Sequence, residues 1–453
     1  MLLLGAAFFL TLAVRPGHAE TRETDLANGM KVIVKVDHRA PVVTSQVWYR
    51  AGSMDESYGV TGVAHVLEHM MFKGTEAVPA GEFSKRIAAV GGKENAYTSR
   101  DQTVYFQTLR KEELELALRL EADRMANLKL DAGEFAKEIQ VVREERRMRT
   151  EDNPQALLFE KLMATAFVSH PYRHPVIGWM GDLENMTVAD AQHWYRTWYA
   201  PNNATLIVAG DVEPERVFDL ARQYFGALPA QALPERKPQT EPAPSGLKQV
   251  ELKAPAKLPV VVLSWQVPRL TRPAEEWEPY ALEVLAGVLN GHATARLPQA
   301  LVNEKRVAVD VGASYDAVSR GPGVFFADVT PAEGKTAEQA LAALKGEIDW
   351  VKLAGVNGKE LERVKAQVLA GQVFQQDSLF YQAMLIGEWR TAGLDYRQRD
   401  LRYEKLRQVT AEQVRAVANK YLMDDRLTIA RLDPQPMSEA AAPRPALGGR
   451  HGG

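Results

Sequence analysis

The chain contains two similar blocks, and this internal repeat limits its fold more than any other feature of the sequence. An alternating run opens at Pro41 in the first block and at Pro259, 218 positions later, in the second. Near the end of each block a helical pattern leads into a β-rich segment, beginning at Met186 and at Val409, 223 positions apart. Chance similarity of common elements is the alternative, but the matching order at both ends argues against it. The sequence therefore predicts one arrangement of elements made twice.

Strands and helices are mixed inside each block. Lys31–Val36 and Val42–Tyr49 alternate between apolar and polar residues as strands do, and Ser99–Leu109 is expected to be another strand. Lys111–Leu130 instead carries apolar residues at helical spacing. We therefore expect an α+β fold of two tandem homologous domains, each a mixed, mostly antiparallel sheet with packed helices.

A polar, proline-rich stretch, Leu228–Gly246, interrupts the periodic pattern between the blocks and indicates a linker. A second low-complexity stretch ends the sequence and is typical of a frayed tail. We expect a first domain over residues 20–230, a linker over 231–246, a second domain over 247–436 and a flexible tail over 437–453.

The first nineteen residues form an apolar run, Leu2 to Val14, followed by small residues that end at Ala19. This run is short for a membrane span and is typical of a secretory signal peptide. An uncleaved N-terminal anchor is the alternative. No later stretch approaches the roughly twenty apolar residues that a membrane helix needs. We therefore expect a soluble mature protein beginning near Glu20, located in the periplasm or outside the cell.

The composition excludes several kinds of chemistry. The sequence has no cysteine, so disulfides, thiolate zinc sites, thiol catalysis and iron–sulfur clusters are ruled out. Any metal must be held by histidine, aspartate or glutamate, and there are only nine histidines. A formal net charge of −3 gives no reason to expect nucleic acid or an anionic membrane as a partner.

Two of these histidines stand four residues apart in a helical stretch, as His65-Val66-Leu67-Glu68-His69. Positions i and i+4 lie on one helix face, so both imidazoles can reach one metal ion. Glu68 falls on the same side, where a carboxylate can accept a proton from water at the metal without itself binding the metal. The pattern H-x-x-E-H supports the chemistry of a zinc peptidase. Two packing histidines on an amphipathic helix are the alternative interpretation.

A catalytic zinc needs a third protein ligand. Candidates lie on a charged helical stretch in which Glu138 and Glu145 are two turns apart and share a face, whereas Glu144 points about 100° away. Such a pair suits one ligand and one supporting carboxylate. A solvated, ion-paired helix is an equally good interpretation of this stretch taken alone.

These residues resemble the pitrilysin family of zinc peptidases (M16, the inverzincins), which includes the mitochondrial processing peptidase and insulin-degrading enzyme. The segment HVLEHMMFKGTE matches the family motif, and the tandem halves match as well. The resemblance implies a zinc metalloendopeptidase that hydrolyses unfolded peptides or small proteins, with one Zn²⁺ per chain. It implies that His65, His69 and Glu145 bind the zinc, that Glu68 is the general base, and that Glu138 assists.

The resemblance also implies an edge strand beside the zinc, formed by Asn95, Ala96, Tyr97 and Thr98. An exposed edge can hold an extended peptide substrate through main-chain hydrogen bonds. For any one of these residues, an ordinary turn into a strand is an equally good interpretation.

The second half departs from the family. Where the family has an arginine and a tyrosine that grip the substrate, this chain has Val302 and Val309, neither of which can donate a hydrogen bond. Arg306 and Tyr315 lie nearby but off register. The resemblance therefore implies the catalytic subunit of a heterodimer, like the beta subunit of the mitochondrial processing peptidase, with a homologous partner supplying the missing pair.

A hypothesis of a different class is a non-catalytic structural subunit, which some members of the family have become. The presence of His65, Glu68, His69 and Glu145 together argues against it, because a retired site need not keep all four.

Overall fold

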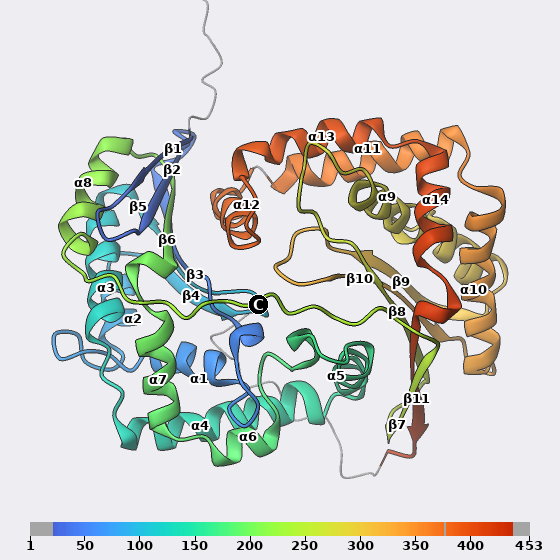
Figure 1. Ribbon diagram of the computed structural model, residues 1–453, viewed down its shortest axis with the longest axis horizontal. Helices are drawn as coiled ribbons and strands as arrows, with labels where there is room; N and C mark the ends of the chain where they lie inside the picture. Colours follow the sequence, from blue (N-terminus) through green and yellow to red (C-terminus); the bar gives the residue numbers. More distant parts are fainter. Residues whose placement is uncertain (1–20, 376, 438–453) are drawn as a thin grey trace, which may run out of the picture.

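The structure, a computed structural model, describes residues 21–375 and 377–437. Two open sheets stand side by side, one in each half of the chain, with helices packed on them (Figure 1). The predicted α+β fold of two tandem domains is confirmed. The predicted signal peptide (1–19) and almost all of the predicted tail lie outside the described residues. No helix in the described part of the chain is long and apolar enough to cross a membrane.

The first half contains a six-stranded sheet in the order β1-β2-β6-β3-β5-β4. Only β2 and β6 pair in parallel, and the other neighbours are antiparallel. Its strands are β1 (Thr21–Asp25), β2 (Lys31–Val36), β3 (Val42–Tyr49), β4 (Lys93–Thr98), β5 (Thr103–Arg110) and β6 (Ala204–Gly210). Its helices are α1 (Val63–Met70), α2 (Glu82–Ala89), α3 (Leu114–Asn127), α4 (Ala132–Arg146), α5 (Pro154–Ala166), α6 (Met180–Asn185), α7 (Val188–Trp198) and α8 (Pro214–Phe225).

The second half repeats this topology with five strands in the order β7-β11-β8-β10-β9. Its one parallel pair, β7 with β11, corresponds to β2 with β6. Its strands are β7 (Lys248–Pro255), β8 (Val260–Val267), β9 (Ala308–Tyr315), β10 (Gly323–Pro331) and β11 (Leu427–Gln435). Its helices are α9 (Glu278–Asn290), α10 (Ala337–Ala354), α11 (Gly358–Gln375), α12 (Leu379–Thr391), α13 (Arg399–Gln408) and α14 (Ala411–Tyr421).

The two halves exchange one helix each. Helix α5 of the first half packs against β7, β8 and β11 of the second sheet. Helix α12 of the second half packs against β3 and β6 of the first sheet. In Figure 1 these helices lie between the two sheets. They also occupy corresponding places in the repeat, since α12 begins 225 positions after α5.

Strand β3 shows why both faces of the first sheet must be covered. Val43, Val47 and Tyr49 alternate into the core of the first half, whereas Trp48 points the other way, into the core of the second half. On that second face Gln46 accepts a hydrogen bond from the Trp48 indole (2.9 Å) and donates one to a main-chain carbonyl of α12 (3.1 Å). The residue pattern of β3 therefore already requires a partner from the other half.

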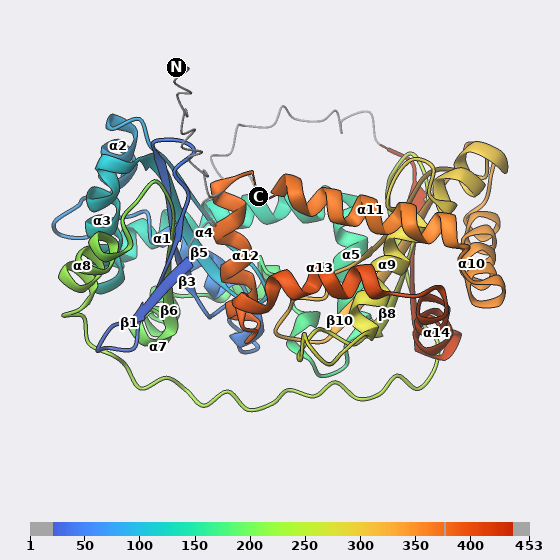
Figure 2. The same ribbon diagram turned by 90° about the horizontal axis from the view of Figure 1, so that it is seen from above.

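The predicted linker runs as an extended chain from one half to the other (Figure 2) and is fastened along its length. Arg236 forms an ion pair with Asp55 in the short helix η1 (Ser53–Asp55) at 3.2 Å. The Glu241 carboxylate accepts main-chain hydrogen bonds from the loop after α5 (2.6–2.9 Å). These contacts fix its path across the two halves.

Two predicted elements differ from the structure in their bounds. Ser99–Leu109 is not one strand, because Ser99–Gln102 form the turn between β4 and β5, where the Ser99 hydroxyl accepts the N–H groups of Asp101 and Gln102. The helix expected over Lys111–Leu130 is α3, with a single 3-10 turn before it. Four apolar residues that stand at helical spacing in it are all buried: Leu114, Ala117, Leu118 and Met125.

Candidate metal centre and active site

Helix α1 carries the H-x-x-E-H motif and is fixed at its first turn. The buried Glu56 carboxylate accepts the main-chain N–H groups of Gly62 (2.8 Å) and Ala64 (2.9 Å), which have no partner inside the helix. Almost every residue of α1 is buried, because the helix packs against α4, α7 and β4. This packing holds the histidines of the motif in place.

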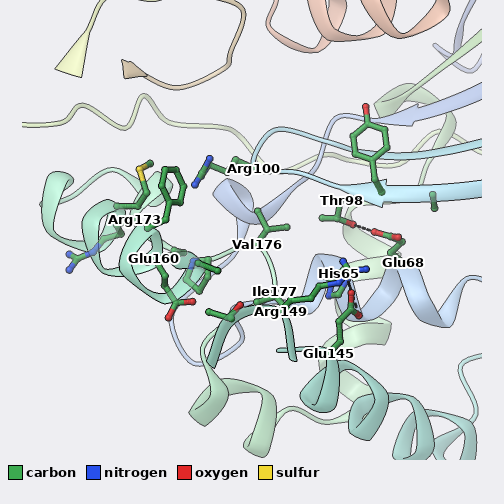
Figure 3. A pocket seen from close by; sticks show the side chains of 18 residues that line it. His65, Glu68, Thr98, Arg100, Glu145, Arg149, Glu160, Arg173, Val176 and Ile177 are labelled. Carbon is green, nitrogen blue, oxygen red and sulfur yellow. Dashed lines mark hydrogen bonds and ion pairs between the residues drawn. The ribbon is translucent and has the colours of Figure 1, made fainter. Parts of the chain in front are cut away.

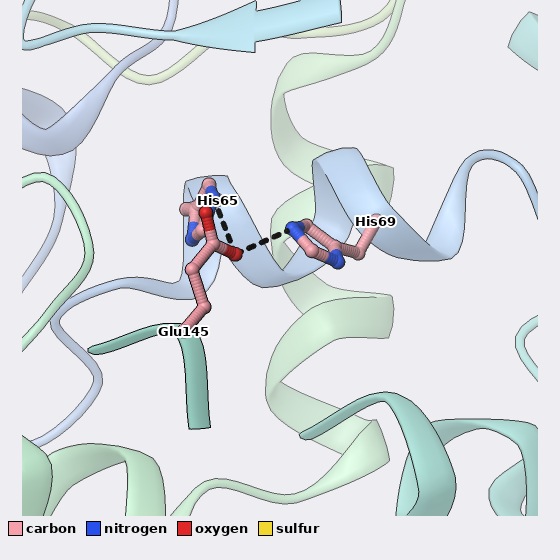
Figure 4. Close-up of side chains that lie close together, drawn as sticks. All are labelled: His65, His69 and Glu145. Carbon is pink, nitrogen blue, oxygen red and sulfur yellow. Dashed lines mark ion pairs between the residues drawn. The ribbon is translucent and has the colours of Figure 1, made fainter. Parts of the chain in front are cut away.

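The two histidines of α1 meet Glu145 of α4. Nε2 of His69 lies 3.3 Å and Nε2 of His65 lies 3.8 Å from the same Oε2 atom of Glu145 (Figure 4). Within the described ranges this is the one group of three or more histidine, aspartate or glutamate side chains whose ligand atoms all lie within 4.8 Å of one another. We call these three side chains the metal cluster, after the ion that they could hold. Two imidazoles and one carboxylate are the donor set of many catalytic zinc sites, so the residues fit zinc.

Glu138 lies behind His69 and orients it. Its Oε1 atom lies 2.9 Å from Nδ1 of His69, and its other oxygen forms an ion pair with Lys73. Burial lowers the pKa of His69, but hydrogen bonds to Glu138 and Glu145 outweigh it and raise the pKa to about 9. Sequence reasoning missed Lys73, although its spacing of four residues from His69 would have suggested it.

Glu144 and Glu145, two further glutamates of α4, differ as the helical phase predicts. Burial raises the pKa of Glu145, but His69, His65 and Arg149 outweigh burial and bring it to about 2. Arg149 lies in the π-helical turn η3 (Arg147–Glu151) and binds the second oxygen of Glu145 at 2.7 Å. Glu144 is exposed and pairs with Arg147.

Glu68 is buried on the same side of α1 and is held by strand β4. The Thr98 hydroxyl donates a hydrogen bond to Oε2 of Glu68 at 2.5 Å. Burial raises the pKa of Glu68 to about 7, although this hydrogen bond acts in the opposite direction. A carboxyl group with a pKa near neutrality is suited to accept a proton and return it.

A pocket of about 370 Å³ opens beside these residues (Figure 3). His65, Glu68 and Glu145 line it, together with Ala96, Tyr97 and Thr98 of β4. Strand β4 is the edge strand of its sheet. The structure thus brings the predicted strand to the metal cluster, but Asn95 does not line the pocket.

The second half contributes none of the described residues that line this pocket. Val302 lies in η6 (Pro298–Glu304) and packs against the core of the second half. Val309 is half exposed on β9. Tyr315 lines a neighbouring pocket instead, where its hydroxyl donates to the carbonyl of Pro268 at 2.6 Å.

Comparison with known protein families and proteins agrees with this geometry. Residues 31–178 match Insulinase (Peptidase family M16), and residues 185–368 match the Peptidase M16 inactive domain. The chain is 31% identical to the zinc protease PqqE of Helicobacter pylori over 415 residues, which are 90% of this chain and 92% of the relative. It is 33% identical to the probable mitochondrial-processing peptidase subunit beta of Arabidopsis thaliana over 209 residues, which are 46% of this chain and 39% of that protein.

A solved structure is also similar over nearly the whole chain. The crystal structure of a protease from Helicobacter pylori superimposes with a TM-score of 0.87 at 29% sequence identity. The similarity covers 92% of this chain and 100% of that one. Both halves and the exchange of helices between them therefore fall within the region of similarity.

Proposed function

Because the chain belongs to the insulinase family of peptidases, peptidase family M16, and is a zinc metallopeptidase, we propose that it is an endopeptidase that cuts unfolded peptides and small proteins. The observation that supports this most strongly is the meeting of His65, His69 and Glu145 beside the carboxylate of Glu68 in one pocket. We place the zinc-binding domain at residues 20–230, the linker at 231–246 and a homologous second domain at 247–436.

His65, His69 and Glu145 are the proposed zinc ligands. Zinc held there would supply a Lewis acid that polarises the scissile carbonyl and makes water more acidic. Glu138 acts through His69: its carboxylate accepts a hydrogen bond from Nδ1–H and so keeps the Nε2 atom facing Glu145. Arg149 holds the other carboxylate oxygen of Glu145 in place.

Glu68 is the proposed general base. It takes a proton from the attacking water and later delivers it to the leaving amine, so that the carboxylate is regenerated in each turnover. The hydrogen bond from Thr98 fixes one oxygen of Glu68 and leaves the other for this transfer. Thr98 thus connects the proposed base to strand β4, which borders the pocket.

Strand β4 is the proposed binding edge for the substrate. An extended peptide that pairs with Ala96, Tyr97 and Thr98 would lie directly against Glu68 and the metal cluster. Main-chain pairing reads side chains weakly, which agrees with unfolded peptides as the substrate class. Asn95 belongs to the same strand but is not among the residues that line the pocket.

The experiment that tests this function is metal-dependent peptide hydrolysis. The purified chain is incubated with an unfolded, internally quenched peptide before and after removal of zinc by a chelator. We expect cleavage at internal bonds that is lost with the metal and restored by about one equivalent of Zn²⁺ per chain. Hydrolysis that survives chelation, or release of terminal residues only, would contradict the proposal.

We further propose that the chain is the catalytic subunit of a heterodimer. The lining of the pocket comes from the first half, and Val302 and Val309 lack hydrogen-bond donors. A homologous subunit of the same family would supply the arginine and tyrosine across an interface. One donor that stabilises an oxyanion is commonly worth about 2.7–4 kcal/mol, so the isolated chain should be about 10²–10³-fold slower than the complex.

Peptide hydrolysis by the purified chain, alone and with a homologous subunit that has the pair but lacks H-x-x-E-H, measures this difference. Full activity of the chain alone, unchanged by the partner, would mean that another donor such as Arg306 or Tyr315 takes the role.

Export to the periplasm or the medium is proposed from the apolar leader. Cell fractionation followed by N-terminal sequencing of the mature protein should place the new terminus near Glu20. A mature protein that retains Met1 and sediments with membranes would instead identify the leader as an anchor.

A further inference from the structure

Arg100 lies in the turn that follows β4 and lines both the pocket of the metal cluster and the neighbouring pocket of about 480 Å³. Its buried Nε atom has no hydrogen-bond partner among the described residues. The guanidinium instead lies 5.6 Å from the ring centroid of Tyr172. Burial lowers the pKa of Arg100, yet an arginine remains charged at neutral pH. Attraction to Tyr172 and Asp101 opposes the effect of burial, but among the described residues no hydrogen bond or ion pair holds this guanidinium at the border of the two pockets.

No acidic group near Arg100 forms an ion pair with it among the described residues. Asp316 and Glu388 line the second pocket, but burial raises the pKa of both carboxyl groups, and Asp316 also accepts the Val318 N–H (2.9 Å). Asp101, the adjacent carboxylate, accepts hydrogen bonds from the Tyr172 hydroxyl (2.5 Å) and from the main-chain N–H of Arg320 (2.8 Å). Of the other acids in the pocket, Glu160 forms its ion pair with Arg146 at 2.8 Å. A partly buried charge is costly unless an opposite charge compensates it. The group that compensates Arg100 is therefore expected to come from outside the described chain.

The main chain at Arg100 is fixed, so the side chain is presented to the pocket without reorganisation. The carbonyl oxygen of Ser99 accepts a hydrogen bond from Ser53 N–H (3.1 Å), and that of Arg100 accepts one from Met54 N–H (3.0 Å). In Figure 3 Thr98 stands between Glu68 on one side and Arg100 on the other, and the guanidinium points away from Glu68. Arg100 follows Thr98 by two residues, just beyond the end of β4.

We propose that Arg100 is a specificity-determining residue that binds a carboxylate of the peptide substrate on one side of the scissile bond. This inference rests on the proposed function, because it takes the substrate to lie along β4. A carboxylate accepts two parallel hydrogen bonds from a guanidinium, the strongest pairing available to an unpartnered arginine. The carboxylate can belong to an acidic side chain or to the C-terminus of a short peptide.

Peptide binding to the zinc-loaded Glu68→Gln chain tests the proposal without requiring turnover. Fluorescent neutral peptides are compared with versions that carry one glutamate in place of glutamine at each position in turn, and with a free C-terminal acid in place of the amide. We expect one carboxylate position to tighten binding about 10- to 100-fold. The responding peptide identifies which carboxylate binds Arg100. It is a side chain if one of the glutamate peptides binds more tightly, and the C-terminus if only the free-acid peptide does.

Replacement of Arg100 tests whether this residue causes the preference for acidic peptides. In the Glu68→Gln background, Arg100→Gln should reduce the acid preference to about one, and Arg100→Lys should restore part of it. Arg173→Gln is the matched control, because Arg173 lines the same pocket but its guanidinium donates to the Val168 carbonyl at 2.6 Å. It should leave the acid preference intact.

Absence of any acid preference, or a preference that survives Arg100→Gln, overturns the proposal. The two proposals can also fail separately. If the wild-type chain cleaves no peptide but Glu68→Gln still prefers acidic peptides and loses this preference in Arg100→Gln, the endopeptidase proposal is refuted and the carboxylate site is upheld.

Discussion

At the scale of single residues, four glutamates around the metal cluster carry the same carboxyl group in four different surroundings. Glu68 is buried beside a single hydroxyl donor, and its pKa is raised to about 7. Glu138 and Glu145 face histidine and a cation, which hold their pKa values below the usual range. Glu144, one residue before Glu145, is exposed. Position on a helix, rather than residue type, thus separates the proposed base from the proposed ligand Glu145, the supporting carboxylate Glu138 and a surface charge.

Glu68→Gln should abolish peptide hydrolysis while leaving zinc bound. Glutamine keeps the size of the side chain and can still contact Thr98, but it cannot accept the proton, so we expect a loss of about 10²–10⁴-fold or more. Activity assays combined with metal analysis of the same preparation check both parts. Loss of zinc along with activity would identify Glu68 as a ligand instead.

Glu145→Gln should lower zinc affinity, whereas Glu144→Gln, its neighbour and matched control, should not. Removal of the carboxylate leaves two imidazoles, too few for a stable catalytic site. Zinc content after dialysis against a weak chelator measures the difference. Equal zinc in the two variants would contradict the choice of ligand.

At the scale of elements, the turn between β4 and β5 carries Arg100 and directly follows Thr98, which joins the proposed base to the proposed binding edge. Gly52 allows this turn to approach η1: a Cβ atom added at Gly52 would lie 2.5 Å from the Ser99 carbonyl oxygen and 2.7 Å from that of Arg100. The turn thus has its position fixed by a residue outside the sheet.

Gly52→Ala should therefore destabilise the protein by about 1–3 kcal/mol, since the backbone must move to admit the methyl group. Gly181→Ala is the control, because a Cβ at Gly181 meets nothing within 4 Å. It should change stability by less than about 0.5 kcal/mol. Urea unfolding of both variants measures the change in the free energy of unfolding. Equal unfolding midpoints would show that the turn can move to admit the methyl group without a loss of stability.

Local patterns were sufficient to predict the elements with strong periodicity. The bounds of β2 and β3 agree with the prediction residue for residue, and helical phase correctly paired Glu138 with Glu145. The strand expected from Ser99 was wrong at its start because Ser99–Gln102 pair locally through a serine hydroxyl, which alternation does not reveal. Which helix covers which sheet depends on contacts between residues hundreds of positions apart, and no periodicity records those.

At the scale of the whole molecule, the exchange of α5 and α12 joins the two halves by direct packing of each helix on the other half's sheet. Gly387 on α12 lies so close to Trp48 that a Cβ added there would lie 2.1 Å from the indole Cε2 atom. Asp37 and Gln382 add a hydrogen bond across the same contact at 3.0 Å. Helix α12 therefore seats directly on the first sheet.

Gly387→Ala should destabilise the fold by about 1–3 kcal/mol or more, because the rigid indole cannot move without disturbing two cores. Gly346→Ala on the exposed face of α10 is the control: nothing lies within 4 Å of its Cβ, and alanine favours helix by up to about 1 kcal/mol. Thermal unfolding of the two variants should shift in opposite directions. A neutral Gly387→Ala would mean that α12 is loosely docked.

The exchanged helices also set the order in which the protein can be completed during its synthesis. Trp48 leaves the ribosome early, but the helix that covers it follows more than 300 residues later. The nascent first half therefore has an uncovered apolar sheet face until almost the entire chain has been made. Closing so long a loop is slow and leaves such a face open to aggregation or to a chaperone.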